Sequence, residues 1–368
     1  MNKVPEMENS ELERKLQELK EEYANTKYNK ATDKHLGILR AKIAKISKAL
    51  RSKKKKHGAG FSVKKSGDAT VALVGFPNSG KSSLLKALTG VDSKIAGYAF
   101  TTTNLIPGML EYKGAKIQIF DIPGLIEGAH EGKGEGYKIA SAIRVADLLL
   151  IVVDANDYRQ VYSLLEELAK LSIRIGEQKL RLEEEERGGI TIVSNGHNVP
   201  GEKEVKEVLN GFGIYNATVV FYADSSIGEL IDAASGGIYI NAIIALNKVD
   251  LVSDYNAIVK ELEENTKLKV VPISALNHYN IEELEEALFS ALKLIRIYLK
   301  PKLNTEKSEL MIMRSGATVG DVAMHIHSGL AKEMKYAYIT GPSAKFKNQK
   351  VGKDHILMDG DIVTLNLK

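Results

Sequence analysis

The sequence contains no cysteine, which excludes disulfide bonds and thiolate-bound metal sites. It also lacks long apolar runs: its strongly apolar stretches, such as residues 148–153, have the length of a strand and are too short to span a bilayer. The first residues are polar and charged, without the apolar segment of a secretory signal peptide. We therefore expect a cytoplasmic protein that has no membrane partner.

Charge of both signs is present, but it is distributed unevenly along the 368 residues. Residues 1–66 hold 18 Lys and Arg against 8 Asp and Glu (+10), residues 67–295 hold 21 against 32 (−11), and residues 296–368 hold 12 against 7 (+5), giving +4 for the chain. Basic ends around an acidic middle indicate a nucleic-acid partner, and we expect it to be RNA. The alternative is a lysine-rich surface that is only solvated.

The first 66 residues are predicted to form a basic helical hairpin. Leu and Tyr recur at three- and four-residue steps in residues 8–25, and Leu and Ile do so in residues 33–50, which is the spacing of one helix face. The basic cluster Lys53–Lys56 follows the second of these segments. Residues 1–66 contain few aromatic residues, so stacking on single-stranded nucleic acid is poorly supported in this region.

The rest of the chain is predicted to form an α/β domain and a small β-rich module. Residues 67–294 alternate strand and helix patterns in the rhythm of a doubly wound sheet. Residues 172–240 interrupt this rhythm and are expected to form an inserted αβ subdomain, with a charged helix over Glu177–Arg187. Residues 295–368 alternate like short strands around a single helix near residues 319–331.

A phosphate-binding loop follows the apolar run at residues 70–74. Its sequence is Gly75-Phe76-Pro77-Asn78-Ser79-Gly80-Lys81-Ser82, with Ser83 next in the helix. The glycines let backbone N–H groups approach phosphates closely, and the helix that starts at Lys81 adds a partial positive charge. Lys81 is expected to reach the β- and γ-phosphates, and the Ser82 hydroxyl is expected to bind Mg²⁺.

Two further segments are predicted to surround the third phosphate. Asp121-Ile122-Pro123-Gly124 ends an apolar strand, so its carboxylate can hold Mg²⁺ through water and Gly124 N–H can reach the γ-phosphate. In isolation this motif would be a simple turn. The polar loop with Phe100, Thr101, Thr102 and Thr103 offers a threonine for Mg²⁺, and we expect Thr102 to be that residue. The alternative is a threonine run entering a strand.

The base-recognition residues come last in the chain. Asn247-Lys248-Val249-Asp250 follows an apolar strand, and Asp250 can accept hydrogen bonds from guanine N1–H and its 2-amino group. Adenine lacks this donor pair, which argues against an ATPase. Lys248 can lay its stem over the base, and Asn247 can brace the loops. The backbone N–H groups of Ser274-Ala275-Leu276 can reach guanine O6.

Together these motifs resemble the Obg-type GTPases, and most of all the developmentally regulated GTP-binding protein family. The resemblance is carried by the loop at residues 75–82, by Tyr98-Ala-Phe-Thr-Thr102, by Asp121-Ile-Pro-Gly-Leu-Ile-Glu-Gly-Ala129 and by Gly132-Lys-Gly134. Ala99 departs from the residue more usual in the family. The resemblance implies a P-loop GTPase domain with an insertion, a C-terminal TGS domain of β-grasp fold, and Mg²⁺ with GTP or GDP. It also implies slow GTP hydrolysis, association with ribosomes and a small stabilising partner protein.

The predicted catalytic set is Lys81, Thr102, Gly124 and Asn78. Leu125 stands where many small GTPases carry the glutamine that orients the attacking water, so intrinsic hydrolysis should be slow. In related GTPases an asparagine at the place of Asn78 helps to hold K⁺ beside the phosphates, which would stabilise transition-state charge. The alternative is that Asn78 only tightens the loop.

We interpret the chain as a monomeric, GTP-controlled switch that engages the translation machinery. The two segments expected to respond to the γ-phosphate, residues 94–104 and 124–137, are rich in glycine, which suits loops ordered by GTP and released after hydrolysis. The alternative from a different class is a constitutive RNA-binding scaffold whose nucleotide is structural. RNA affinity that does not depend on the nucleotide would favour that alternative.

Overall fold

The computed structural model describes residues 65–90, 107–122, 141–301 and 308–367, with scattered positions between 14 and 46. The chain divides into two compact units, one formed by residues 1–60 and 165–240 and the other by residues 61–164 and 241–368. Most of the predicted N-terminal hairpin and both segments expected to respond to the γ-phosphate lie outside the described residues. None of the helices in the described ranges has the length and apolar content needed to cross a bilayer.

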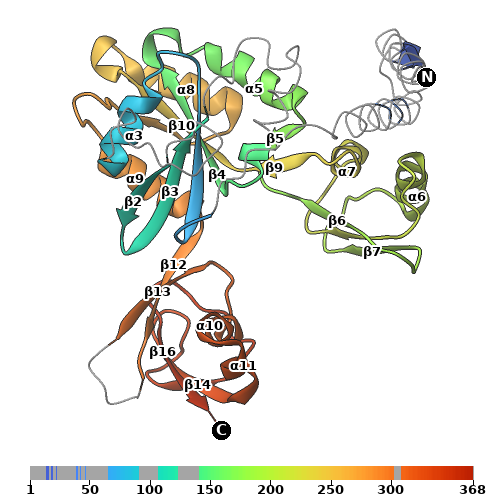
Figure 1. Ribbon diagram of the computed structural model, residues 1–368, viewed down its shortest axis with the longest axis vertical. Coiled ribbons are helices and arrows are strands. Elements are labelled where there is room, and N and C mark those ends of the chain that lie inside the picture. The colour runs from blue at the N-terminus through green and yellow to red at the C-terminus, as the bar shows by residue number, and fades with distance from the viewer. Residues whose placement is uncertain are drawn as a thin grey trace, which may run out of the picture. The chain divides into compact units, whose positions relative to one another are not determined.

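The second unit contains a six-stranded sheet in the order β11-β10-β4-β1-β3-β2 (Figure 1). Its strands are β1 (Ala69–Val74), β2 (Pro107–Tyr112), β3 (Ala115–Asp121), β4 (Leu148–Asp154), β10 (Ala242–Asn247) and β11 (Val270–Pro272). Every pairing is parallel except that of β2 with β3. All six residues of β1 are buried, as expected for a central parallel strand covered on both faces.

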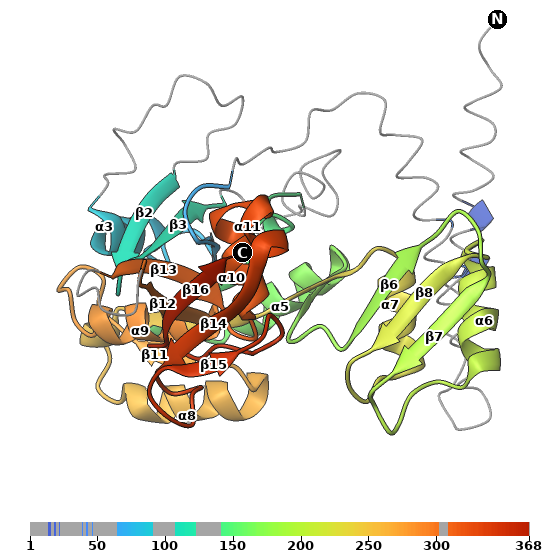
Figure 2. The ribbon, with the colours of Figure 1, turned by 90° about the horizontal axis from the view of Figure 1, so that it is seen from below.

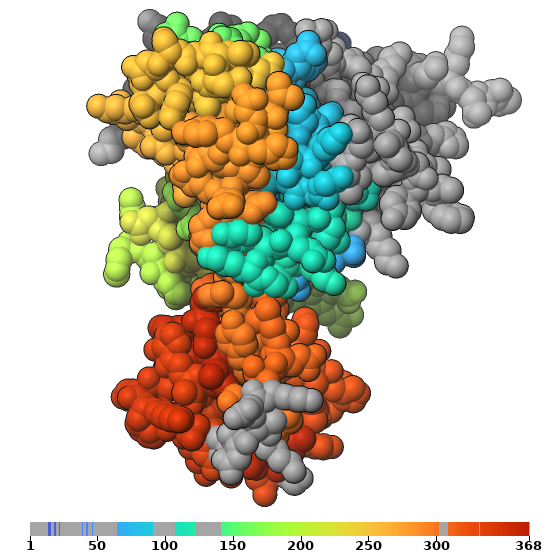
Figure 3. Space-filling view, turned by 90° about the vertical axis from the view of Figure 1, so that its left-hand side faces the viewer, coloured from blue at the N-terminus to red at the C-terminus, as the bar shows by residue number. Residues whose placement is uncertain are grey.

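Helices cover this sheet and join its strands. They are α3 (Lys81–Thr89), α5 (Gln160–Lys170), α8 (Tyr255–Thr266) and α9 (Ile281–Ala291), with short 3₁₀ turns η2 (Ala155–Asp157) and η3 (Val249–Leu251). Leu84 of α3 and Leu284 of α9 are fully buried in one cluster with Val71 and Ile117 of the sheet. Figure 3 shows α3 in blue beside α9 in orange. The predicted P-loop GTPase fold is confirmed.

The unit that contains residues 165–240 differs from the sequence-based prediction in one element. Its elements are β5 (Ile173–Ile175) paired with β9 (Ile238–Ile240), the sheet β6 (Leu180–Glu184), β8 (Ala217–Phe221), β7 (Ile190–Ser194), and helices α6 (Glu202–Gly211) and α7 (Ile227–Ala234). The charged helix predicted over Glu177–Arg187 is wrong, because this segment is strand β6. Leu180 and Leu182 point to the core while Arg181 and Glu183 are exposed, which is the period of a strand.

The C-terminal module is a five-stranded mixed sheet in the order β13-β12-β16-β14-β15 (Figure 2). Its elements are β12 (Leu294–Leu299), β13 (Glu309–Arg314), α10 (Val319–Ile326), α11 (Ser328–Glu333), β14 (Met334–Thr340), β15 (Gln349–Val351) and β16 (Ile362–Leu367). The single helix predicted near residues 319–331 is wrong, because extended backbone at His327 separates two helices. The His327 ring Nδ1 accepts a hydrogen bond from Gly329 N–H at 3.1 Å and so caps α11.

Candidate nucleotide-binding site

The site lies where the carboxyl ends of β1, β3, β4 and β10 meet at one edge of the sheet. Strand order reverses beside β1, because its two neighbours are β3 and β4, and open α/β sheets bind ligands at such a point. The loop after β1 leads into α3 through Gly80, which has a φ of 93°. A Cβ atom there would be strained and would collide with the Asn247 side-chain amide, so this position requires glycine. Gly80 gives α3 no side-chain cap, which leaves its first N–H groups for an anion.

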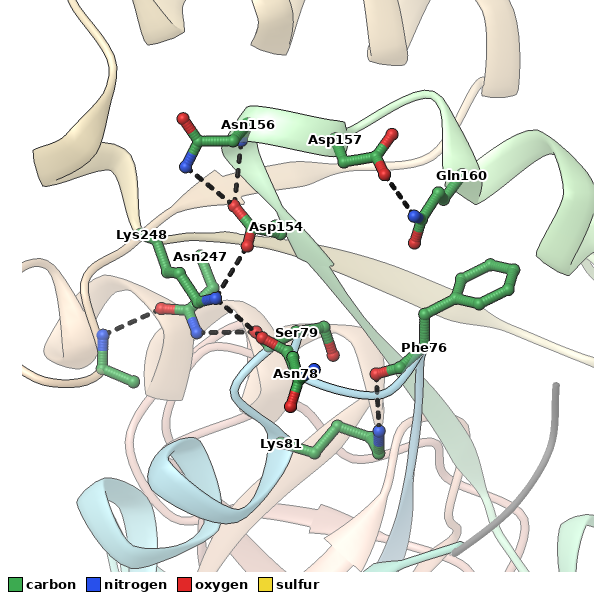
Figure 4. Close-up of polar contacts among 11 residues, drawn as sticks. Phe76, Asn78, Ser79, Lys81, Asp154, Asn156, Asp157, Gln160, Asn247 and Lys248 are labelled. Atoms are coloured by element: carbon green, nitrogen blue, oxygen red, sulfur yellow. Dashed lines mark hydrogen bonds and ion pairs between the residues drawn. The ribbon is translucent and has the colours of Figure 1, made fainter.

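Lys81 is held by the carbonyl groups of its own loop. Its Nζ donates to the carbonyl oxygens of Gly75 and Phe76, both at 2.9 Å. Figure 4 shows the bond to Phe76. Burial lowers the pKa of Lys81, and the charge of Asp121 opposes that shift. Burial likewise raises the pKa of Asp121, against the charge of Lys81. Both groups therefore carry their charge at a cost that a bound phosphate or cation would relieve.

Two buried oxygen atoms on this side have no hydrogen-bond partner among the described residues. They are Ser79 Oγ and Asp121 Oδ1. An unsatisfied buried polar group costs about 1–3 kcal/mol, so its retention points to a missing partner such as an ion or ligand. Oxygen atoms of carboxylates and hydroxyls are the ligands that Mg²⁺ prefers. Ser82 is an exposed residue at the start of α3. The residues present fit a Mg²⁺-bound phosphate.

The opposite side of the site is internally braced by Asn247. Its side chain is buried, with Nδ2 donating to the Ser79 carbonyl at 2.9 Å and Oδ1 accepting from Ala275 N–H at 3.0 Å. One amide therefore ties the phosphate loop to the loop that follows β11. Both polar ends of Asn247 are satisfied before any ligand binds, which fixes the relative position of the two loops.

Lys248 adds a second tie, which joins the phosphate loop to the end of β4 (Figure 4). Its Nζ donates to the Asn78 carbonyl at 2.7 Å and forms an ion pair with Asp154 Oδ2, also at 2.7 Å. Both Lys248 and Asn78 have left-handed backbone, with φ of 63° and 62°. The side-chain stem of Lys248 thus runs along the site while its charge is already paired.

Asp154, at the end of β4, is a residue that the sequence analysis missed. Its carboxylate Oδ1 accepts from the backbone N–H and side-chain amide of Asn156, at 2.9 Å and 3.1 Å. Burial alone would raise the pKa of Asp154, but the hydrogen bonds from Lys248 and Asn156 outweigh it and hold that pKa below its usual value. An acidic residue at the end of a buried strand, as at Asp121, was a signal for its position at the site, but not for its pairing with Lys248.

The predicted base-recognition residues also converge here. Asp250 is exposed in η3, whose position is fixed by the hydrogen bond from Val249 N–H to the Ile273 carbonyl at 3.2 Å. Ser274 is buried and its hydroxyl accepts from Asn277 N–H at 3.3 Å. Leu276, beside it, is 82% exposed, which leaves an apolar surface available to a flat ring.

The structure therefore assembles most of the predicted site. Brought to one sheet edge are the residues of the phosphate loop, the magnesium side and the base side: Asn78, Ser79, Gly80, Lys81, Ser82, Ser83, Asp121, Ile122, Asn247, Lys248, Asp250, Ser274, Ala275 and Leu276. The remaining predicted residues lie outside the described residues: Phe100, Thr101, Thr102, Pro123 and Gly124.

Comparison with known families agrees with this geometry. Residues 70–182 match a family described as 50S ribosome-binding GTPase, residues 187–294 match the C-terminal region of that domain, and residues 295–366 match the TGS domain. An uncharacterized GTP-binding protein of Methanocaldococcus jannaschii is 41% identical over 97% of this chain and 93% of its own length.

Two relatives carry a more specific name. The developmentally-regulated GTP-binding protein 1 homolog of Dictyostelium discoideum is 40% identical and covers 96% of this chain and 99% of its own. Developmentally-regulated GTP-binding protein 1 of Xenopus laevis is 39% identical and covers 95% of this chain and 98% of its own. The similarity therefore spans nearly the full length of both chains.

Proposed function

The chain belongs to the developmentally regulated GTP-binding protein family of GTPases, and we propose that it is a slow GTPase that acts as a nucleotide-controlled switch on the ribosome. The observation that carries the proposal is the contrast between the two sides of the site. Internal hydrogen bonds hold the base side, whereas two buried oxygens on the phosphate side have no hydrogen-bond partner among the described residues. Such a site responds to whether a phosphate is present. The match to a family described as ribosome-binding, the TGS match and the basic ends support the ribosome as the partner.

Binding of GTP would complete the hydrogen bonds that the protein leaves open. Backbone N–H groups from Asn78 to Ser83 would surround the phosphates, and Lys81 would exchange its loop carbonyls for phosphate oxygens. Asp250 would accept from guanine, whose faces would lie against the stem of Lys248 and the exposed Leu276. Backbone N–H groups of the loop at Ser274 and Ala275 would reach guanine O6.

Ser82, Thr102 and Asp121 are the residues that we propose to hold Mg²⁺. When bound, the ion would neutralise the negative charge that develops on the phosphate groups. Asp121 contributes a carboxylate that burial has already made costly, so cation binding recovers part of its desolvation free energy. Ser79 Oγ is the other unsatisfied oxygen, and it would gain a partner from the bound nucleotide.

Hydrolysis would depend on charge stabilisation rather than on an activating glutamine, since Leu125 occupies that position. Lys81 would neutralise charge on the transferred phosphoryl group, while Thr102 and Gly124 would contact the γ-phosphate. We also propose that Asn78 helps to hold K⁺ at the phosphates. Hydrolysis should then be faster in K⁺ than in Na⁺, and Asn78→Ala should remove the difference; equal rates of the unsubstituted protein in both salts would contradict a K⁺ site.

The switch is tested by sedimenting ribosomes through sucrose with the protein bound to GDP or to a non-hydrolysable GTP analogue, at moderate salt. We expect co-sedimentation that depends on the γ-phosphate. Equal binding in both states would favour a constitutive RNA-binding scaffold, which the basic ends also allow. Absence of binding in both states would contradict the ribosome as partner and direct the search to a small partner protein.

A further inference from the structure

The β14–β15 hairpin of the C-terminal module carries an aromatic and basic surface that the nucleotide site does not use. Along β14, Ala337 and Ile339 are buried in the core of the module, so Tyr336 and Tyr338 lie on the opposite, outward face. The two tyrosine rings meet edge to face, with centroids 5.3 Å apart. Lys350 of β15 pairs with Tyr338 across the strands, and its Nζ lies 3.9 Å from the ring centroid of Tyr336.

The turn of the same hairpin presents a phenylalanine between two lysines. Phe346 is 64% exposed, and the neighbouring Lys345 and Lys347 are exposed as well. An exposed aromatic ring contributes little to folding, so Phe346 can be replaced with little loss of stability. The tyrosines, Lys350 and this turn belong to one hairpin, which Figure 2 shows at the β15 edge of the sheet.

Hydrogen bonds hold the turn that carries Phe346 in a fixed shape. Asn348 N–H donates to Thr340 Oγ1 at 2.9 Å, and Lys345 N–H donates to Gln349 Oε1 at 2.6 Å. At its start, Ser343 N–H donates to the buried Asp361 Oδ1 at 3.1 Å. The exposure of Phe346 is therefore a feature of an ordered turn, and a ring held in place loses less entropy when it binds a partner.

We propose that this hairpin surface, formed by Tyr336, Tyr338, Lys345, Phe346, Lys347 and Lys350, binds single-stranded RNA. Bases would stack on Phe346 and on the tyrosine rings, while the lysines would neutralise phosphates along the strand. The chemistry favours a polyanion over a protein partner, because residues 296–368 hold 12 Lys and Arg against 7 Asp and Glu. The inference rests on the proposed function, since it gives the switch a defined RNA contact.

The test measures fluorescence anisotropy of a labelled 12-nucleotide, mixed-sequence single-stranded RNA with the full-length, GDP-bound protein. Lys53–Lys56 are changed to Gln throughout, which lowers binding by the basic cluster near the N-terminus. Phe346→Ala should weaken binding about tenfold through loss of one stacking partner. The double change Lys345→Gln and Lys347→Gln should reduce the slope of log affinity against log salt by about 1.4.

The matched control is Tyr215→Ala, which removes a ring that is also 64% exposed but lies in the other unit. Tyr215→Ala should leave RNA affinity unchanged. Phe346→Ala should leave GDP affinity and the rate of GTP hydrolysis unchanged. Equal RNA affinity of the Phe346→Ala and unsubstituted proteins would overturn the proposal, as would an equal loss in Tyr215→Ala. Photo-crosslinking of RNA that contains 4-thiouridine should label peptides within residues 336–350, and labelling confined to other segments would contradict it.

These readouts separate the hairpin from the switch. Hairpin-dependent RNA affinity together with ribosome binding that ignores the γ-phosphate would overturn the proposed switch and leave the hairpin assignment standing. The opposite result is ribosome binding that depends on the γ-phosphate, with ribosome binding and RNA affinity both unchanged by Phe346→Ala. It would support the switch and overturn the hairpin assignment. In that case the hairpin surface would be assigned to a protein partner instead.

Discussion

The base side and the phosphate side of the nucleotide site are built by different means. On the base side, Asn247 and Lys248 join the loops through hydrogen bonds of 2.7–3.0 Å that exist without a ligand. On the phosphate side, two buried oxygens lack partners among the described residues, and Lys81 occupies carbonyls of its own loop. Among the described residues, the base side is satisfied by internal hydrogen bonds, whereas we propose that the bound nucleotide completes the phosphate side.

This difference follows from what each side must recognise. Guanine is the same in GTP and GDP, so a rigid frame that positions Asp250 gives affinity and selectivity at no cost to regulation. The phosphates differ between the two nucleotides, and only contacts that differ between two states can shift a conformational equilibrium. Under the proposed function, GTP and GDP would satisfy to different extents the two oxygens that lack partners among the described residues.

The largest expected effect comes from Asp250, the residue that we propose recognises the base. Asp250→Ala should weaken GDP binding by roughly a thousandfold, because guanine N1–H and its 2-amino group would lose their acceptor. Discrimination against ADP should fall by a similar factor. Competition titrations with both nucleotides measure this, and Glu264→Gln, an exposed acidic change on α8, serves as the control. Unchanged discrimination in Asp250→Ala would mean that the base lies elsewhere.

The next effect should come from breaking the brace between the two sides. Asn247→Ala leaves the Ser79 carbonyl and Ala275 N–H without their partner, and should lower the free energy of unfolding by about 2–4 kcal/mol. Nucleotide affinity should fall with it, since the loops lose their shared anchor. Chemical denaturation with and without GDP measures both effects. Asn277→Ala, in the same loop but exposed, should change neither.

A smaller effect of opposite sign is expected on the phosphate side. Asp121→Asn replaces a buried carboxylate with a neutral group, so the nucleotide-free protein should become more stable by about 1–3 kcal/mol. The same variant should lose most of the stabilisation that Mg²⁺ and GDP provide together. Thermal unfolding in EDTA and in Mg²⁺ with GDP separates these contributions. A less stable nucleotide-free variant would show that Asp121 is satisfied without a ligand.

How far the sequence could predict this site depended on whether a residue acts locally. The phosphate loop and the Asn247–Asp250 motif were predictable because each is a contiguous segment at a strand end. The role of Asp154 was not, since it arises only when β4 and β10 pair and bring Lys248 within 2.7 Å. The unsatisfied state of Ser79 Oγ likewise depends on burial by distant segments.

The same distinction explains the errors in the fold. Strands β1 and β10 were predictable from continuous apolar runs, which central parallel strands require. Strand β6 was predicted as a helix because its charged residues suit a helix surface, whereas its state is set by antiparallel pairing with β8. The break between α10 and α11 depends on the cap formed by the His327 ring, which the apolar pattern does not encode.

The smallest expected effect concerns Asp154 and its ion pair on the base side. Its pKa is held below the usual value, so its contribution to stability is present above about pH 4 and is lost as the pH falls through the lower, folded-state pKa. Asp154→Asn should therefore flatten the acid limb of the stability curve and cost about 1 kcal/mol or less at neutral pH. Urea unfolding between pH 3 and pH 7 tests this; parallel curves for both proteins would refute it.

Hydrogen exchange with and without Mg²⁺ and GDP tests most directly whether the nucleotide completes a half-built site. The amide groups of Val249 and Ala275 already have partners at 3.2 Å and 3.0 Å, so we expect slow exchange without nucleotide and little further change. The amides from Asn78 to Ser83, around the uncapped start of α3, should gain strong protection on binding. Equal gains on both sides would contradict a preassembled base side, and no gain in the phosphate loop would contradict the site itself.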